Sequence, residues 1–410
     1  MADVKAFQGF RPRADVVDRV AALPYDVYNR EEAKAEVERE PFSFLKVDRA
    51  ETQFDDSMDM YAPEVYQKAK ELLTGMIQEG IYVQEDKNVY YIYELTMEGR
   101  VQTGIVACAS IDDYQNNVIK KHENTREEKE IDRINHVDIC NAQTGPIFLA
   151  YRAEELIDAV VNHVKTGTPV YRFTSPDGIG HAVWVIRDDA DIAQIEEGFR
   201  RVDSIYIADG HHRAASAVKV GLKRRAEHPN YDGTEEFNYF LSVLFPHNQL
   251  MIMPYNRVIK DLAGRTEEEF LGCLEESFDV EQQSEPVNPE KKATFGMYLN
   301  RKWYLLKAHP DVCGEDPVEG LDVSILQKQV FEKLLNITDP RTDNRIDFVG
   351  GIRGLQELER RANEDMCLAF SMYPTSIMEL FEVSDAGLLM PPKSTWFEPK
   401  LRSGIFIHQL

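Results

Sequence analysis

The densest group of residues that could do chemistry is Asp-Gly-His-His-Arg, at positions 209 to 213. The segment before it, Ser204 to Ala208, is apolar and β-prone, which predicts a buried strand. The segment after it, Ala214 to Val220, has a helical composition. The two histidines and the arginine are therefore expected in the first turn of a helix, where free N–H groups and the helix dipole favour a bound anion.

Each member of this group has a possible role in a phosphate site. Gly210 lets the backbone approach a ligand closely, and Arg213 can donate paired hydrogen bonds to phosphate oxygens. His211 and His212 can donate further hydrogen bonds or move protons. Asp209 is a candidate ligand for Mg²⁺ or a candidate base, although it could simply cap the helix. So many polar or permissive residues between an apolar strand and a good helix indicate a binding site.

A second cluster begins at Lys120 and continues through Lys121, His122, Glu123, Thr125 and Arg126. Phosphoryl transfer needs positive charge around the transferred group and a residue that receives the proton of the attacking hydroxyl. Glu123 is the first candidate for that base. Lys121 would offset developing charge, with His122 and Thr125 beside it. The alternative is a solvated, charged helix start, because TREEKEIDRIN (residues 125 to 135) predicts a helix here.

Three shorter segments are further candidates for substrate contacts. Tyr25 and Asp26 lie in Pro-Tyr-Asp-Val, and Asp26 is the second candidate for the base. Arg345 lies among acidic residues before two glycines, and an ordinary turn explains that group as well as an anion site does. The segment Lys393, Ser394 and Thr395 could bind a phosphate or a carboxylate if the C-terminal tail covered a cleft.

Composition restricts the class of protein. The chain has 410 residues and a formal net charge of -24, which disfavours nucleic acid because such binding depends on Lys and Arg neutralising phosphates. The sequence shows no secretory signal pattern and no apolar run of the roughly 20 residues that span a bilayer. Five widely spaced cysteines without a C-x-x-C pair are typical of a reducing compartment. We therefore expect a cytoplasmic protein that binds a small molecule and has neither a nucleic-acid nor a membrane partner.

Strands alternating with helices predict an α+β fold with a mixed sheet. Residues 88–95 and 101–111 predict a hairpin, residues 64–78 a helix, and Pro41 to Val47 a buried strand. With soft boundaries, we expect an N-terminal α/β region at 1–145, a core with the phosphate motif at 146–260, and a C-terminal α/β region with a covering tail at 261–410.

The pattern from Asp209 to Ala217 resembles the phosphate-binding motif of the ParB/sulfiredoxin superfamily, in which a turn at a helix N-terminus binds nucleotide phosphates. The whole chain resembles an uncharacterised bacterial and archaeal family named SpoOJ/ParB-like, which is related to the free serine kinases. Four further motifs carry that resemblance: Pro24 to Val27, Lys121 to Thr125, Asp343 to Phe348, and Pro392 to Phe397. Asn256-Arg257 departs from the family, where His-Arg is frequent.

The resemblance implies a kinase that moves a phosphoryl group between a donor and the hydroxyl of free L-serine, in either direction. ATP, ADP or pyrophosphate would be the donor, with Mg²⁺ as the expected cofactor. The main alternative is a nucleotide- or phosphate-binding regulatory protein without turnover. A DNA-binding partition protein would need a basic helix-turn-helix, which we do not find. A metal-dependent hydrolase would need a di-metal spacing that the sequence does not show.

Overall fold

The computed structural model describes all residues from Met1 to Leu410. The chain divides into two compact units, one made of residues 1–250 with 399–410, and one made of residues 251–398. These boundaries differ from the three ranges predicted from the sequence. The predicted boundary at 145/146 lies inside the first unit, because β8 (Ile147–Tyr151) pairs with β12 (Tyr239–Pro246), which also pairs with β5 (Arg100–Ser110).

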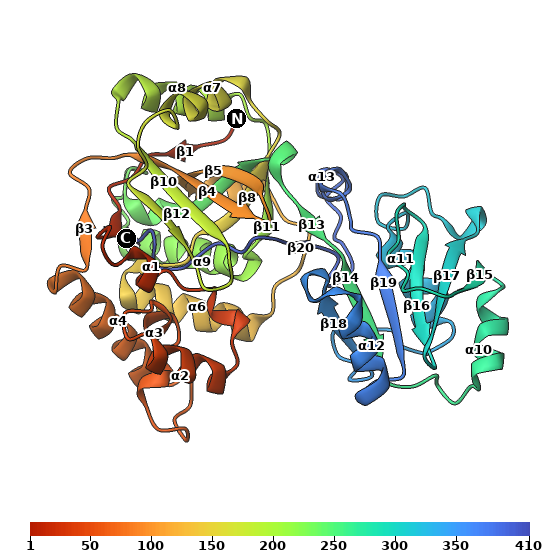
Figure 1. The fold of residues 1–410 in the computed structure, drawn as a ribbon. Helices are drawn as coiled ribbons and strands as arrows, with labels where there is room; N and C mark the ends of the chain where they lie inside the picture. Colours follow the sequence, from red (N-terminus) through yellow and green to blue (C-terminus); the bar gives the residue numbers. More distant parts are fainter. The chain divides into compact units, whose positions relative to one another are not determined.

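The first unit is built on a nine-stranded mixed sheet with the order β6-β11-β8-β12-β5-β4-β10-β9, and β1 pairs with β5 (Figure 1). The predicted hairpin is confirmed, because β4 and β5 pair antiparallel. Besides β5 and β8, the strands of this sheet are β1 (Val4–Lys5), β4 (Tyr90–Met97), β6 (Ile119–Lys120), β9 (Tyr171–Thr174), β10 (Gly180–Ile186), β11 (Ile205–Asp209) and β12 (Tyr239–Pro246).

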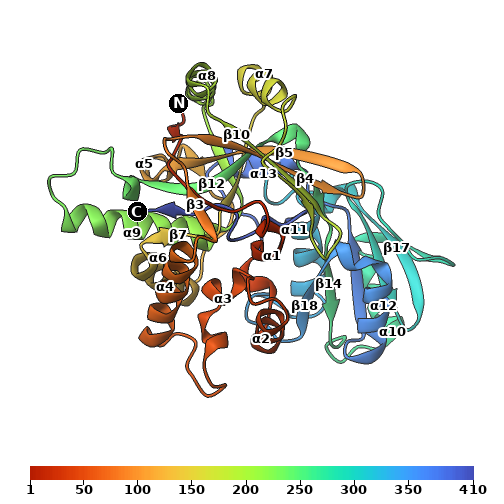
Figure 2. The same cartoon turned by 60° about the vertical axis from the view of Figure 1, so that its left-hand side comes forward.

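Apolar residues at alternate strand positions form the core of this sheet with α7, α8 and α9. The helices α7 (Glu155–Val164) and α8 (Asp189–Arg200) lie side by side over the sheet (Figures 1 and 2). The remaining helix in that core, α9 (His211–Glu227), follows β11 directly, as the sequence predicts. Short helix α5 spans Ile111–Gln115.

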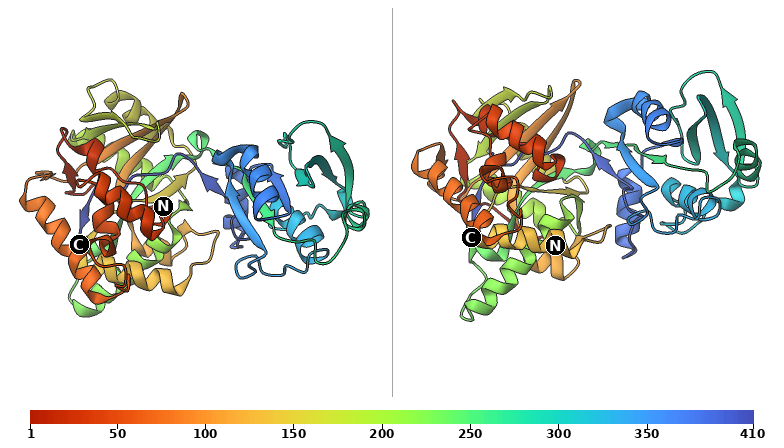
Figure 3. Two further views of the ribbon diagram at one scale, coloured as in Figure 1. Left: turned by 60° about the horizontal axis from the view of Figure 1, so that its bottom comes forward. Right: turned by 90° about the horizontal axis from the view of Figure 1, so that it is seen from below.

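A second apolar cluster joins the N-terminal helices to α6 (Glu127–Cys140). These helices gather in one layer of the first unit (Figure 3). They are α1 (Val17–Val20), α2 (Arg30–Arg39), α3 (Leu45–Asp48) and α4 (Pro63–Gln78). The predicted helix at 64–78 is confirmed, whereas the strand predicted for Pro41 to Val47 is wrong. A short apolar run suits a buried helix as well as a strand, and Phe44, Leu45 and Val47 are fully buried in this cluster.

The C-terminal segment 399–410 belongs to the first unit. Its residues Ile405, Phe406 and Ile407 are buried, and the ring of Phe406 contacts those of Tyr91 and Tyr93. Strand β21 (His408–Gln409) pairs with β7 (Ala142–Gln143), and β2 (Phe10–Pro12) pairs with β3 (Tyr82–Gln84). The end of the chain is therefore a structural part of the unit that contains the predicted phosphate motif.

The second unit is an antiparallel six-stranded sheet with the order β15-β17-β16-β19-β14-β18. Its strands are β14 (Tyr255–Ile259), β15 (Phe278–Gln283), β16 (Thr294–Leu299), β17 (Lys302–Ala308), β18 (Ile346–Gly350) and β19 (Leu368–Met372), with the separate pair β13 (Ile252–Met253) and β20 (Trp396–Phe397). Its helices are α10 (Glu267–Leu274), α11 (Asp322–Leu326) with a π-helical turn at Gln327–Glu332, α12 (Gly354–Glu364) and α13 (Ile377–Asp385).

The chain is therefore a mixed α/β protein, in agreement with the predicted fold class. None of its helices combines the length and the apolar composition that a crossing of the bilayer requires. All five cysteines are free thiols, as expected from their spacing.

Candidate functional site

The turn between β11 and α9 has the geometry predicted for an anion site. Gly210 is the N-cap residue of α9 with φ +93°, a left-handed conformation that favours glycine, and no side chain caps the helix. The N–H groups of the first helical turn therefore have no partner within the helix. Strand β6 runs parallel to β11, so the residues that follow the two strands emerge at the same edge of the sheet. Lys121, His122 and Glu123 follow β6 at that edge.

Arg213 curls back over the glycine of this turn. Its guanidinium donates to the carbonyl of Pro146 at 2.5 Å. A Cβ atom added at Gly210 would lie 3.1 Å from both Nε and Nη2 of Arg213. The guanidinium therefore occupies space that a larger residue at 210 would restrict.

Asp209 is held by cationic and backbone donors. Lys400 lies 3.0 Å from Oδ2, and the N–H of Gly210 donates to Oδ1 at 2.8 Å. Burial raises the pKa of Asp209, but the charges of Lys400 and Arg213 lower it by more, to well below its usual range. So acidic a carboxyl is a weak base, which disfavours Asp209 as the proton acceptor.

A Mg²⁺ site at Asp209 does not fit these surroundings. Both of its oxygens already accept hydrogen bonds, and the charges nearest to it are cations. No group of three or more His, Cys, Asp or Glu side chains is arranged to hold a metal ion. Asp209 is better suited to orient Lys400 and the first turn of α9 than to bind a cation.

His122 and His211 form a buried pair beside Asp209. Their rings are perpendicular, with centroids 4.5 Å apart, and both side chains are almost fully buried. Burial lowers the pKa of His122 to about 4 and that of His211 well below its usual value, and Lys121 adds to the effect on His211. Both rings are therefore neutral near pH 7. Nε2 of His211 is buried without a hydrogen-bond partner, so it can exchange a hydrogen bond with a ligand.

His212 lies on the other side of the helix start. Its Nε2 accepts a hydrogen bond from the N–H of Arg126 at 2.9 Å, and burial lowers its pKa, while the nearby charge of Asp26 opposes that shift. The Thr125 hydroxyl donates to the Glu130 carboxylate, which also pairs with Lys219. Thr125 is thus engaged in orienting the start of α6.

A pocket of about 490 Å³ adjoins this turn. Its lining includes Arg213, Gly145, Ser403, Asp48 and Arg133. A second pocket of about 300 Å³ shares four of its lining residues with the first, namely Tyr25, Asp48, Arg133 and His136.

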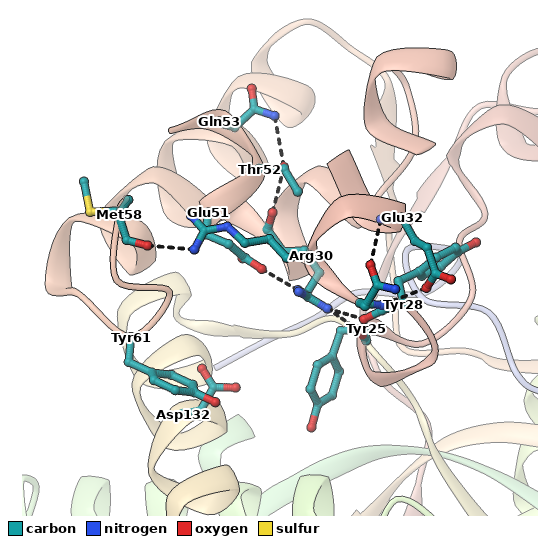
Figure 4. A network of polar contacts seen from close by, with 12 residues as sticks. Tyr25, Tyr28, Arg30, Glu32, Glu51, Thr52, Gln53, Met58, Tyr61 and Asp132 are labelled. Atoms are coloured by element: carbon teal, nitrogen blue, oxygen red, sulfur yellow. Dashed lines mark hydrogen bonds and ion pairs between the residues drawn. The ribbon is translucent and has the colours of Figure 1, made fainter. Parts of the chain in front are cut away.

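These pockets share a wall of buried polar and charged residues that no sequence motif predicted. They are Asp48, Arg49, Glu51, Asp132, Arg133 and His136, all at least nine-tenths buried. Figure 4 shows Glu51, Asp132 and Tyr25 around this polar network. The guanidinium of Arg133 lies 4.0 Å above the Tyr25 ring, and burial raises the pKa of Tyr25 to about 12. One signal was present in the sequence: polar residues 48, 49 and 51 directly follow the apolar run that ends at Val47.

The structure thus brings the predicted residues of the first unit together around the start of α9. These are Tyr25, Asp26, Lys121, His122, Thr125, Asp209, Gly210, His211, His212 and Arg213, and Glu123 directly follows His122 in the chain. Four predicted substrate residues belong to the second unit instead. There, Arg345 pairs with Asp343 at 2.7 Å.

The other three form the segment before β20. The Ser394 hydroxyl donates to the Pro391 carbonyl at 2.6 Å, and Arg257 donates to the Lys393 carbonyl at 3.0 Å. Lys393 has φ +59°, which makes this segment a tight turn in which Thr395 follows Ser394.

Comparison with known proteins identifies a family. A family model described as "Protein of unknown function (DUF1015)" matches residues 4–324. No curated protein matches the chain.

Several solved structures show a distant likeness. A free serine kinase variant in complex with AMP is 13% identical with a TM-score of 0.36, covering 73% of this chain and 92% of that one. A conserved hypothetical protein from Pyrococcus furiosus is 13% identical with a TM-score of 0.34, covering 75% and 95%. SbnI from Staphylococcus aureus, truncated at its C-terminus, is 11% identical with a TM-score of 0.37, covering 72% and 85%. TM-scores this low do not establish a shared fold.

Proposed function

The chain belongs to the DUF1015 family, and we propose that this member is a phosphotransferase that uses the start of α9 as its donor site. The donor is ATP, ADP or pyrophosphate, and the acceptor is the hydroxyl of a small metabolite. L-Serine is the first candidate for that metabolite, on the basis of the sequence resemblance to the free serine kinases. The relation to the ParB/sulfiredoxin superfamily remains a prediction.

The observation that carries the proposal is the uncapped first turn of α9 beside a pocket. Gly210 exposes the N–H groups of that turn, and Arg213 adds a guanidinium that also lines the pocket. Lys121 and Lys400 add positive charge around the same turn. The charge of Lys121 acts on His211, and that of Lys400 acts on Asp209. Phosphoryl transfer works mainly by such positioning and charge.

In the proposed step, the acceptor oxygen attacks the terminal phosphorus of the donor. A new O–P bond forms as the bond between that phosphorus and the bridging oxygen breaks, and the shortened donor leaves with the electron pair. Glu123 accepts the hydroxyl proton, with Asp26 as the second candidate. Asp209 is disfavoured in this role because the charges of Lys400 and Arg213 hold its pKa well below its usual range.

A phosphoryl-transfer screen tests the proposal. Purified full chain with Mg²⁺ would be offered L-serine and other small hydroxyl compounds against ATP, ADP and pyrophosphate. We expect a phosphorylated product from the wild type and a loss of at least tenfold in kcat/KM with Arg213→Ala, because a charge-assisted phosphate contact is lost. Arg200→Ala, on the exposed side of α8, is the matched control and should keep full activity.

Absence of product from every pairing would refute the phosphotransferase. If phosphate ligands still bound in an Arg213-dependent manner, the result would favour the alternative of a nucleotide- or phosphate-binding regulatory protein without turnover.

A further inference from the structure

The two pockets of the first unit share a wall in which buried negative charges outnumber buried positive charges. Tyr25, Asp48, Arg133 and His136 line both pockets. The wall stands on α3, on α6 and on the turn that contains Tyr25. One of its faces is therefore turned toward the pocket that Arg213 also lines.

Four of the five charged residues of this wall form two ion pairs. Nε of Arg49 lies 2.5 Å from Glu51, and Nη2 of Arg133 lies 2.8 Å from Asp132. The Tyr66 hydroxyl donates a further hydrogen bond to Asp132 at 3.1 Å. Within each pair the two charges balance. Asp48 is therefore the one carboxylate of the wall without an ion-pair partner.

Asp48 has no such partner although only 5% of its surface is exposed. The Thr144 hydroxyl donates to Oδ1 at 2.9 Å, and this is its one hydrogen bond. No Lys, Arg or His nitrogen lies within 4.0 Å of its carboxylate, and Oδ2 accepts no hydrogen bond. Because Asp48 lines both pockets, this oxygen is available to a molecule in them.

His136 does not supply the missing positive charge. Its Nε2 lies 3.1 Å from the Val47 carbonyl, and burial together with the charge of Arg133 lowers its pKa. The imidazole is thus neutral near pH 7 and donates to the backbone. The charge of Arg133 also acts on Asp48, from farther than 4.0 Å. Because Arg49 and Arg133 are already balanced by Glu51 and Asp132, the wall keeps one excess negative charge, and a ligand that brings a cation would complement it.

We propose that Asp48 binds a primary ammonium group, so that the acceptor is an amino alcohol or a hydroxy amino acid. The ammonium donates to Oδ2, and the rest of the molecule lies in the pocket that extends to Arg213. The role of this amine as acceptor rests on the proposed function, whereas its binding rests on the pocket alone.

Calorimetric titration of the full chain with three probes tests this site. L-Serine and ethanolamine carry an ammonium group, whereas 3-hydroxypropionate carries a hydroxyl and a carboxylate without one. We expect both amines to bind the wild type, and Asp48→Asn to weaken them by roughly tenfold to 100-fold, the value of a hydrogen bond to a charged group. Asp18→Asn, on the exposed side of α1, is the matched control and should bind like the wild type.

The variant has a second readout that does not depend on a ligand. The amide oxygen of the introduced asparagine can still accept the Thr144 hydroxyl, while the unpaired charge is gone. We therefore expect Asp48→Asn to unfold at a temperature equal to or above that of the wild type. If this variant does not fold, the wild-type order of affinity decides, with ethanolamine at least tenfold tighter than 3-hydroxypropionate.

Equal affinity of wild type and Asp48→Asn for the amines would overturn the inference, as would failure of both amines to bind. Phosphoryl transfer that persists unchanged in Asp48→Asn would refute this site and leave the proposed function standing. Asp48-dependent amine binding without transfer from any donor would refute the proposed function and leave this site standing.

Discussion

Two charged regions of the first unit differ in how their charge is balanced: the start of α9, called the positive end, and the surroundings of Asp48, called the anionic end. At the start of α9, Arg213 and Lys400 surround one carboxylate, Asp209, and backbone N–H groups add to the positive potential. At the anionic end, Asp48 has no ion-pair partner within 4.0 Å, although the charge of Arg133 acts on it, and two complete ion pairs lie beside it. A pocket lined by both Arg213 and Asp48 suits a molecule that carries both kinds of charge.

The two ends also differ in what their charges do for the fold. The positive end consists of backbone groups and of side chains at the edge of the sheet, and its carboxylate, Asp209, has a cationic partner. The anionic end is built from residues that tie α3, α4 and α6 together. Changes at the first end should therefore affect catalysis most, and changes at the second should affect stability as well as binding.

The largest effect is expected from Glu123→Gln. If Glu123 is the base, this change should lower kcat by a factor of roughly 10² to 10⁴, with little change in donor affinity. Steady-state kinetics with the donor and acceptor found in the screen would measure it. Glu127→Gln, four residues later on an exposed position of α6, should keep full activity. If Glu123→Gln loses less than tenfold, Asp26 becomes the base to test.

Arg133→Met tests whether the charges of the anionic end contribute to the stability of the fold. The change leaves Asp132 buried without its cation, which costs about 3 kcal/mol of the free energy of unfolding. Guanidinium denaturation followed by circular dichroism would measure the loss. Arg39→Met removes an exposed pair with Glu36 and should cost less than about 1 kcal/mol. Equal losses in both variants would contradict the structural role assigned to the anionic end.

The same contrast explains how much of the site could be predicted from the sequence. The turn from Asp209 to Arg213 is local, because strand, glycine and helix follow one another in the chain and each has its own signal. The anionic end depends on packing between segments 85 residues apart, at Asp48 and Arg133, and no local pattern encodes that proximity. The strand wrongly predicted for Pro41 to Val47 belongs to the same region.

The domain boundaries show a similar limit at the scale of the fold. The first unit takes its last strand and several buried residues from 399–410, after the chain has completed the second unit. A contiguous division such as 146–260 cannot represent a unit of this kind. Lys400, which holds Asp209, lies in that returning segment and gave no motif near the phosphate turn.

The buried histidine at the positive end should make stability depend on pH. The pKa of His122 is lowered by burial to about 4, below the roughly 6.5 of an unfolded chain. The unfolded state therefore binds an extra proton between these values, and stability falls as pH drops from about 6.5 to 4. This one residue contributes about 1.4 kcal/mol per pH unit.

Denaturation curves at pH 7, 6 and 5 would measure that slope. His122→Gln should lower this slope by the contribution of one proton, while the contributions of the other buried histidines stay the same. His163→Gln, on an exposed position of α7, should leave the slope as in the wild type. An unchanged slope in His122→Gln would mean that its imidazole titrates alike in the folded and unfolded chain.

The smallest effect is expected at Gly210. An alanine there must adopt φ +93°, which costs roughly 1–2 kcal/mol, and its Cβ would lie 3.1 Å from the Arg213 guanidinium. Gly75→Ala is the matched control. It lies inside α4 with no neighbouring atom within 4 Å of the added Cβ, and it should stabilise the protein by about 0.5–1 kcal/mol. The midpoint temperature of thermal unfolding should thus fall in Gly210→Ala and rise in Gly75→Ala. Because the new methyl group displaces Arg213, Gly210→Ala should also weaken donor binding. If it loses stability without any change in donor affinity, the turn serves the fold and does not bind the donor phosphates.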